Sequence, residues 1–459
     1  MKQNWIINRI SRYLEIDEHD SLKVILAACT LFFVIGSYSI LRSLKTSIFL
    51  GFVGREYEPI AKILSIVIMI PVMLLYANIV DRFKRHQAVC LFIGFYAILA
   101  FVFAYLFAHP VYGLANTQTD PYRIVGWAFE IFMDLFQALI VGSFWSFLTS
   151  ISTPEFASKS YGLIVAGSRI GGILTTLCSW LLLEKTHIAG TVSIPLLTGA
   201  TSIFLLLAAY CVYLIRHRIP SSHLHGYQAA YEAEIAKEKA HKKTGVFEGL
   251  RLMLTEPYVL GIFGLVFSFE VINIIFDYQM HVLMSIETNN QVHAMSSFML
   301  FYTGTFQTLS LIFALFGTSK LVKHFGIQRC LLILPMLSIG LAILPILYPR
   351  LSMIFLVMVM LRATNYGFNR PLREMLFIPT IKDIQFKSKA WIDSFGRTFS
   401  KTTGSTINMI AILGAPYFCL LIESVFSIGL AIIWGLIALI VGRRYTKTIA
   451  NNEVIGKQD

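Results

Sequence analysis

The chain has 459 residues, of which 56% are hydrophobic and only 14% are charged. Its mean hydropathy of +0.68 excludes an ordinary soluble globular protein. A formal net charge of +12 would fit a nucleic-acid-binding protein, but the basic residues gather in alternate loops, as in a membrane protein oriented by its positive charges. No nucleic-acid partner is therefore expected. The basic groups lie at residues 9–12, 82–85, 216–243, 320–329, 382–389 and 443–444.

About twelve apolar runs are long enough to cross a bilayer of roughly 30 Å, which takes about 20 helical residues. An outer-membrane barrel would instead show alternating segments of about ten residues. The sequence therefore predicts an all-α polytopic membrane protein that contacts the lipid bilayer. The predicted spans are residues 22–48, 59–80, 87–108, 123–150, 160–183, 190–215, 257–285, 294–319, 328–348, 351–377, 387–412 and 415–442.

A polar segment between the sixth and seventh spans divides the chain into six plus six helices. Its YQAAYEAEIAKEKAHKK stretch alternates Glu and Lys, as in a solvated helix. The positive-inside rule places this linker and both termini in the cytoplasm. The expected organisation is a six-helix half at 1–215, a charged linker at 216–250, a second six-helix half at 251–445 and a tail at 446–459.

The two halves echo each other. VDRFKRH at Val80–His86 follows the second span, and VKHFGIQR at Val322–Arg329 follows the eighth, at an offset of 242 residues. At a second offset, 228 residues, Arg169 corresponds to Arg397. VDRFKRH also resembles the short loop that major-facilitator transporters carry after their second helix. Paired six-helix halves around a midplane site are typical of that fold.

Motifs for covalent or ATP-driven chemistry are absent from the sequence. It contains no GxxxxGK[ST], HExxH or GxSxG pattern. The six cysteines lie in apolar runs without CxxC spacing, which indicates neither a disulfide framework nor a metal site. The chain is therefore expected not to be an enzyme, with no catalytic residue, cofactor or metal.

Charged residues within the spans are the candidates for function. A charge at the centre of a lipid-spanning helix costs about 2.5–3.5 kcal/mol on insertion scales, so such residues persist where they face protein or water. Within the spans the cationic residues outnumber the anionic ones, which suggests that an anionic substrate binds to the excess cations and is then released. The candidate substrate-binding cations are Arg42, Lys45, Arg169, Arg370, Arg373, Arg397 and Lys401.

Two pairs of these cations allow two interpretations. Arg42 and Lys45 share a helix face towards the outer end of the first span. Arg370 and Arg373 lie near the cytoplasmic end of the tenth span, beside Pro371, where we expect the helix to break. Each pair could snorkel to the membrane surface or line the mouth of a cavity.

The carboxylates in the spans are the candidates for charge balance. Glu130 and Asp134, four residues apart, could share a proton or could balance nearby arginines. Glu270 lies about mid-membrane in the seventh span, with Asp277 two turns further on. We expect Glu270 to pair, in the empty state, with a cation of the first half: Arg42, Lys45 or Arg169.

Two further spacings predict local geometry. Asp393, Arg397 and Lys401 step by four residues, which places them in one polar stripe of the eleventh span. Gly167 and Gly171 form a small-xxx-small pair, which allows another helix to approach closely.

At these residues the chain resembles the ATP/ADP translocase (nucleotide transporter) family of obligate intracellular bacteria and plastids. The segments that carry the resemblance are ILRSLKTSI, FWSFLTSISTPEFASKSYGL, FSFEVIN, and FNRPLREMLFIP followed by SKAWIDSFGRTFSKTTGS. The resemblance implies that an essential family lysine falls on Lys45, a functional glutamate on Glu270 and the last essential cation on Arg373.

Some positions depart from the family pattern. Thr46 and Arg370 stand where the family usually has Asp, and Arg373 stands where it has Lys. Arg373 keeps the charge but offers a planar fork instead of a point charge. Ile274 lies where a family lysine is expected. These departures bear on the substrate more than on the fold.

The expected function is transport of an anionic nucleotide, by ATP/ADP exchange or uptake, across a bacterial inner membrane by alternating access. The cations would bind phosphates. Glu270 would act with them, and carboxylates such as Asp134 and Asp393 would balance their charge when no substrate is bound. The alternatives are a carrier of another phosphorylated or organic anion, and a non-transporting membrane sensor of the same fold.

Overall fold

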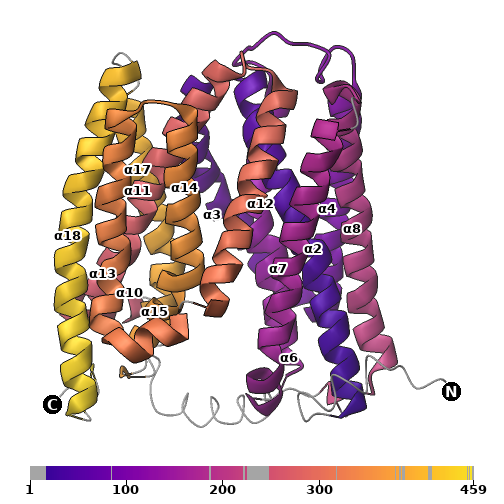
Figure 1. Ribbon diagram of the computed structural model, residues 1–459. Helices are drawn as coiled ribbons and strands as arrows, with labels where there is room; N and C mark the ends of the chain where they lie inside the picture. Colours follow the sequence, from indigo (N-terminus) through magenta and orange to yellow (C-terminus); the bar gives the residue numbers. More distant parts are fainter. Residues whose placement is uncertain are drawn as a thin grey trace. The chain divides into compact units, whose positions relative to one another are not determined.

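The computed structural model describes residues 17–456 except 84, 153, 186–187, 221–222, 225–247, 317, 378, 382–383, 385–387, 412–415, 452 and 454. All regular structure in these residues is helical, and their single β-bridge, between Thr380 and Ile455, forms no strand. The prediction of an all-α protein is confirmed. Figure 1 shows the helices along the chain.

In the first part of the described chain the elements are α2 (Glu18–Phe52), η1 (Arg55–Tyr57), α3 (Glu58–Arg82), α4 (Arg85–Ala108), α5 (Ile124–Phe136), η2 (Gln137–Val141), α6 (Gly142–Ser150), α7 (Pro154–Lys185) and α8 (Gly190–Arg218). In the second part they are α10 (Glu248–Thr255), α11 (Pro257–Glu287), α12 (Val292–Phe316), α13 (Thr318–Leu347), α14 (Leu351–Thr364), η4 (Asn365–Asn369), α15 (Arg370–Leu376), α16 (Lys389–Trp391), η6 (Ile392–Gly396), α17 (Arg397–Ala411) and α18 (Pro416–Ala450).

Nine helices of the described residues are long and apolar enough to cross a membrane. They coincide with nine of the twelve predicted spans, so the protein is a multi-pass membrane protein. The other three predicted spans also fall on helices, namely α3, α12 and the run α16–η6–α17, which are not among the nine. The number of twelve crossings stays a prediction.

Three helical runs contain a wider, π-helical turn. These turns are η2 between α5 and α6, η4 between α14 and α15, and η6 between α16 and α17. The expectation that the helix breaks at Pro371 was wrong, because α15 continues directly from η4. Pro371 is at the start of α15, where its missing N–H is tolerated after the irregular turn. Such π turns often mark functional sites.

The VKHFGIQR segment contains a sharp change of direction. Gly326 has φ 74° and ψ 163°, which interrupts α13 and separates two helical pieces. An L-residue with a side chain rarely adopts this conformation, so glycine is required there. The turn lies where the sequence predicts the connection between the eighth and ninth spans.

The chain forms two compact units. Unit 1 comprises Met1–Gly54, Val67–Lys243 and Gln291–Gly304, and unit 2 comprises Arg55–Ile66, Thr244–Asn290 and Thr305–Asp459. Most of the predicted linker at 216–250 lies outside the described residues. The predicted halves and their boundaries stay predictions.

In unit 1, α2 and α7 pack closely through small residues. A Cβ atom added at Gly171 would lie 2.4 Å from the carbonyl oxygen of Phe32, and one added at Gly167 would lie 3.0 Å from the Cβ of Ala28. A side chain at Gly171 would collide with the α2 backbone, so that position needs glycine, and the space at Gly167 is tight. The close approach predicted from the Gly167–Gly171 spacing is confirmed.

We expect Gly171→Ala to destabilise the protein by about 1–3 kcal/mol, because the added methyl group forces α2 and α7 apart. The matched control is Gly94→Ala in α4, where an added Cβ meets nothing within 4 Å. Thermal unfolding of the purified variants in detergent checks the difference. An equal effect of the two substitutions would contradict this packing.

In unit 2, α11 is the element that positions the polar residues. It packs against α14, α17 and α18, and every residue from 271 to 281 is buried. Asn273, Asp277 and His281 follow one another at four-residue spacing and therefore lie along one face of the helix. Polar groups in a membrane protein persist where protein covers them, and this face is covered by protein.

Candidate functional site

Arg373 is the central cation of unit 2. Its side chain, on α15, is only 5% exposed. Its Nε and Nη1 atoms have no hydrogen-bond partner among the described residues. A buried donor without a partner costs about 1–3 kcal/mol, and more when it is charged, so this guanidinium is suited to a ligand that supplies acceptor oxygens.

The charges around Arg373 leave a positive surplus. The groups that interact with it electrostatically are Arg397, Glu270, Arg370 and Asp393, in decreasing order of effect. Counted with Arg373 itself, these are three cations and two carboxylates. The structure thus brings together five of the residues that the sequence selected, from α11, α15, η6 and α17. We call these five the Arg373 cluster.

The rim of the Arg373 cluster is more accessible than its centre. Arg397 Nη2 lies 2.9 Å from Asp393 Oδ1, with the two side chains 26% and 43% exposed. Arg397 Nε has no hydrogen-bond partner within the described parts of the chain. Arg370 and Lys401 are exposed, and Lys401 lies one turn beyond Arg397. Several donors therefore remain available to an anion.

A nearby ion pair was not anticipated. Lys389 donates a hydrogen bond to Glu374 of α15, and its ammonium lies 5.5 Å from the centre of the Phe377 ring. In the sequence, Lys389 belongs only to the basic group at residues 382–389. Its spacing of 15 residues from Glu374 contains no helical signal that could have linked the two.

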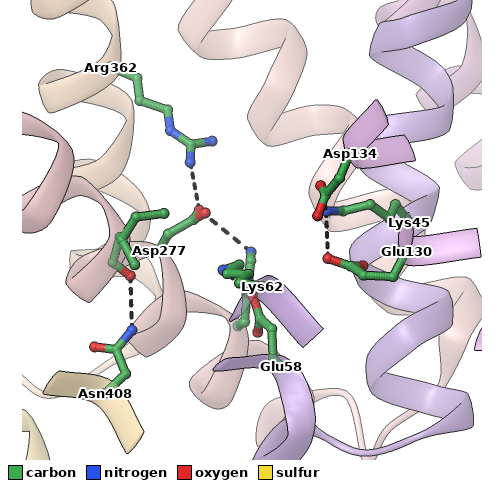
Figure 2. A network of polar contacts seen from close by, with 10 residues as sticks. Lys45, Glu58, Lys62, Glu130, Asp134, Asp277, Arg362 and Asn408 are labelled. Atoms are coloured by element: carbon green, nitrogen blue, oxygen red, sulfur yellow. Dashed lines mark hydrogen bonds and ion pairs between the residues drawn. The ribbon is translucent and has the colours of Figure 1, made fainter. Parts of the chain in front are cut away.

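A second buried arginine, Arg362, has an ion-pair partner and a hydrogen-bond partner within unit 2. Its Nη2 lies 2.8 Å from Asp277 Oδ1, and its Nε donates a 3.0 Å hydrogen bond to Asn273 Oδ1. Asp277 therefore neutralises Arg362, a residue that the sequence analysis did not place in the binding set. Figure 2 shows Asp277 pointing towards Arg362.

The Arg362 network extends along α11 to the start of α3. His281 Nε2 lies 3.6 Å from Asp277, and His281 Nδ1 lies 2.8 Å from Glu58 Oε1. Glu58 Oε1 also accepts a 2.6 Å hydrogen bond from Lys62. Asp277 pairs with Arg362 and Glu58 pairs with Lys62, so this network holds Arg362 in place.

Unit 1 contains a separate charged group around Lys45. The ammonium of Lys45 lies 2.6 Å from Glu130 Oε1 and 2.9 Å from Asp134 Oδ1, and Figure 2 shows it between the two carboxylates. Both carboxylates come from α5, one helical turn apart, which is why one lysine reaches both. The two carboxylates thus neutralise a lysine, where the sequence analysis considered arginines or a shared proton.

Arg42 and Arg169 also belong to unit 1. The guanidinium carbon of Arg42 lies 6.0 Å from the centre of the Tyr38 ring, and Arg42 is partly exposed. Arg169 is partly exposed on α7. The expected pairing of Glu270 with one of these two residues, or with Lys45, stays a prediction. Inside unit 2 the electrostatic neighbour of Glu270 is Arg373.

The amino-acid sequence matches known carriers along most of its length. The family model of the TLC ATP/ADP transporter matches residues 6–445. The ADP,ATP carrier protein 1 of Rickettsia bellii is 23% identical, and the match covers 95% of this chain and 96% of the relative. The ADP,ATP carrier protein 1 of Rickettsia prowazekii is 22% identical with the same coverage.

Solved structures with a similar fold are transporters. The nucleoside transporter NupG has a TM-score of 0.59 at 13% identity and covers 91% of this chain and 99% of its own. The xylose transporter XylE from E. coli has a TM-score of 0.57 at 15% identity, with 93% and 96% covered. These likenesses show that the fold is of the major-facilitator kind. Because the family model spans nearly the whole chain, the protein belongs to the TLC ATP/ADP transporter family, a family of carriers and not of enzymes.

Proposed function

We propose that this protein carries nucleotides, including ATP and ADP, across the membrane by alternating access. The observation that carries the proposal is the buried Arg373 guanidinium, whose Nε and Nη1 have no hydrogen-bond partner in the described residues. Such a fork binds the oxygens of phosphate or carboxylate groups through two parallel charge-assisted hydrogen bonds. The family membership, and relatives named as ADP,ATP carriers, support nucleotides as the source of those phosphates.

In this proposal the Arg373 cluster holds the phosphate chain. Arg373 binds it from the buried side, and Arg370 and Arg397 bind it from the more exposed side, with Lys401 one turn further on. Glu270 and Asp393 reduce the positive charge between substrate visits. Because the three arginines outnumber these two carboxylates, the cluster remains attractive to an anion.

We propose a different role for the Lys45 group. Lys45 is held by Glu130 and Asp134, so a phosphate must compete with these carboxylates for the ammonium. Binding would then release the carboxylates, which links substrate occupancy to the charge of unit 1. Arg42 and Arg169 would add positive charge to the path of the substrate.

The location follows from the same proposal. The relatives are bacterial carriers, which supports a bacterial inner membrane. The excess of Lys and Arg in alternate loops supports two cytoplasmic termini and a cytoplasmic linker at 216–250, between a half at 1–215 and a half at 251–445.

A second candidate is a carrier of another phosphorylated or organic anion. It is favoured by Arg370, an arginine where the family has an aspartate, which makes the site more cationic. Uptake of labelled ATP by proteoliposomes, competed by nucleotides, sugar phosphates, inorganic phosphate and dicarboxylates, separates the two. We expect nucleotides to compete best. Uptake of a labelled sugar phosphate or dicarboxylate, without any uptake of ATP, would overturn the nucleotide proposal.

A further inference from the structure

An aromatic pair lies beside the cationic residues of unit 2. The ring centres of Tyr366, in η4, and Phe306, in α12, are 6.2 Å apart, with an angle of 30° between the ring planes. Phe306 is buried, with 6% exposed, whereas Tyr366 is partly exposed. Phe306 thus packs beside the Tyr366 ring, and the Tyr366 side chain is not fully covered by the protein.

Tyr366 lies on the same helical run as Arg370 and Arg373, which are proposed to bind the phosphates. It precedes Arg370 by four residues and Arg373 by seven. At a rise of about 1.5 Å per residue, these separations are about 6 Å and about 10 Å along the helical run. These separations are similar to the distances between the base of an extended nucleotide and its phosphates. Residues four apart also share a helix face, so Tyr366 and Arg370 face the same side.

Polar contacts hold the residues around the aromatic pair. Arg362, one turn before Tyr366, is fixed by Asp277 and Asn273, and its guanidinium carbon lies 5.8 Å from the centre of the Phe306 ring. The π turn at Asn365–Asn369 contains Tyr366, and a hydrogen bond of 3.1 Å from Asn369 Nδ2 to Asn365 Oδ1 stabilises it. A preorganised ring loses little conformational freedom when a ligand stacks on it.

We propose that Tyr366, supported by Phe306, is the platform on which the base of the nucleotide stacks, while the Arg373 cluster binds the phosphates. This inference rests on the proposed function and adds the base subsite to it. Stacking uses the π face that every nucleobase has, so the platform selects a nucleotide over a base-free phosphate without selecting one base strongly.

The test compares Tyr366→Ala with Tyr366→Phe, which keeps the aromatic face. Uptake of labelled ATP by proteoliposomes is competed by unlabelled ATP or by inorganic tripolyphosphate, which has the phosphates but no base. Stacking of one base contributes about 1–3 kcal/mol, so Tyr366→Ala should weaken competition by ATP about 5- to 150-fold. Competition by tripolyphosphate should not change, and Tyr366→Phe should behave as the wild type.

The wild-type protein provides a test that does not depend on the folding of a variant. Its apparent affinity should be higher for ATP than for tripolyphosphate by a similar factor. Equal affinities, or an equal loss of both in Tyr366→Ala, would overturn the base platform and leave phosphate binding intact. Absence of nucleotide uptake by the wild type would instead overturn the proposed function.

Discussion

Replacing Arg373 with alanine is expected to reduce nucleotide transport by at least about 30-fold, because truncating a buried charged partner costs about 2–5 kcal/mol. The same change is expected to leave the empty protein as stable as before, or more stable. The reason is that Arg373 is buried while two of its nitrogens, Nε and Nη1, have no hydrogen-bond partner in the described chain. Removing an under-partnered buried charge relieves a desolvation cost.

Two measurements on the same preparations check this prediction. Uptake of labelled ATP by proteoliposomes gives the loss of function, and thermal unfolding in detergent without nucleotide gives the stability. Arg373→Lys is the matched control, since it keeps the charge and loses the planar fork, and we expect it to retain part of the activity. Normal uptake by Arg373→Ala would show that the residue has no part in binding. Strong destabilisation would show that its role is structural.

Lys45→Ala is expected to abolish transport and also to destabilise the protein. Without the ammonium, the carboxylates of Glu130 and Asp134 stay adjacent, with the first of them only 3% exposed. Removing one partner of a buried ion pair typically costs about 3–5 kcal/mol. This is the opposite stability effect from that of Arg373→Ala, although both variants lose a cation of the proposed substrate path.

A triple variant separates the two roles of Lys45. Combining Lys45→Ala with Glu130→Gln and Asp134→Asn removes the unbalanced charge, so stability should return towards that of the wild type. Transport should stay lost if the ammonium contacts the substrate. A triple variant that transports at the wild-type rate would reduce Lys45 to a counter-ion of the two carboxylates.

The sequence predicted features that depend on local order. Long apolar runs gave the helical spans, because burying the backbone in lipid requires a helix of about 20 residues. Four-residue spacing placed Asp393 and Arg397 on one polar stripe, and in the structure these two side chains form an ion pair at 2.9 Å. The Gly167–Gly171 spacing anticipated the close packing of α2 and α7. Each of these depends on one helix and its periodicity.

Partners that are distant in the sequence could not be predicted. Lys45 and Glu130 are 85 residues apart, and Arg362 and Asn273 are 89 residues apart. Any of several carboxylates in the spans could have met these cations, and only the packing of the helices selects among them. For the same reason Tyr366 resembled an ordinary apolar position, since neither Phe306 nor the π turn around it has a local sequence signal.

The central claim is that the protein carries nucleotides, and uptake of labelled ATP by vesicles loaded with ADP tests it most directly. Internal ADP permits exchange, and net uptake is detected as well. We predict saturable uptake that unlabelled ATP competes, in vesicles with the wild-type protein and not in protein-free vesicles or in vesicles with Arg373→Ala. Folded wild-type protein that takes up no more labelled ATP than protein-free vesicles would contradict the account.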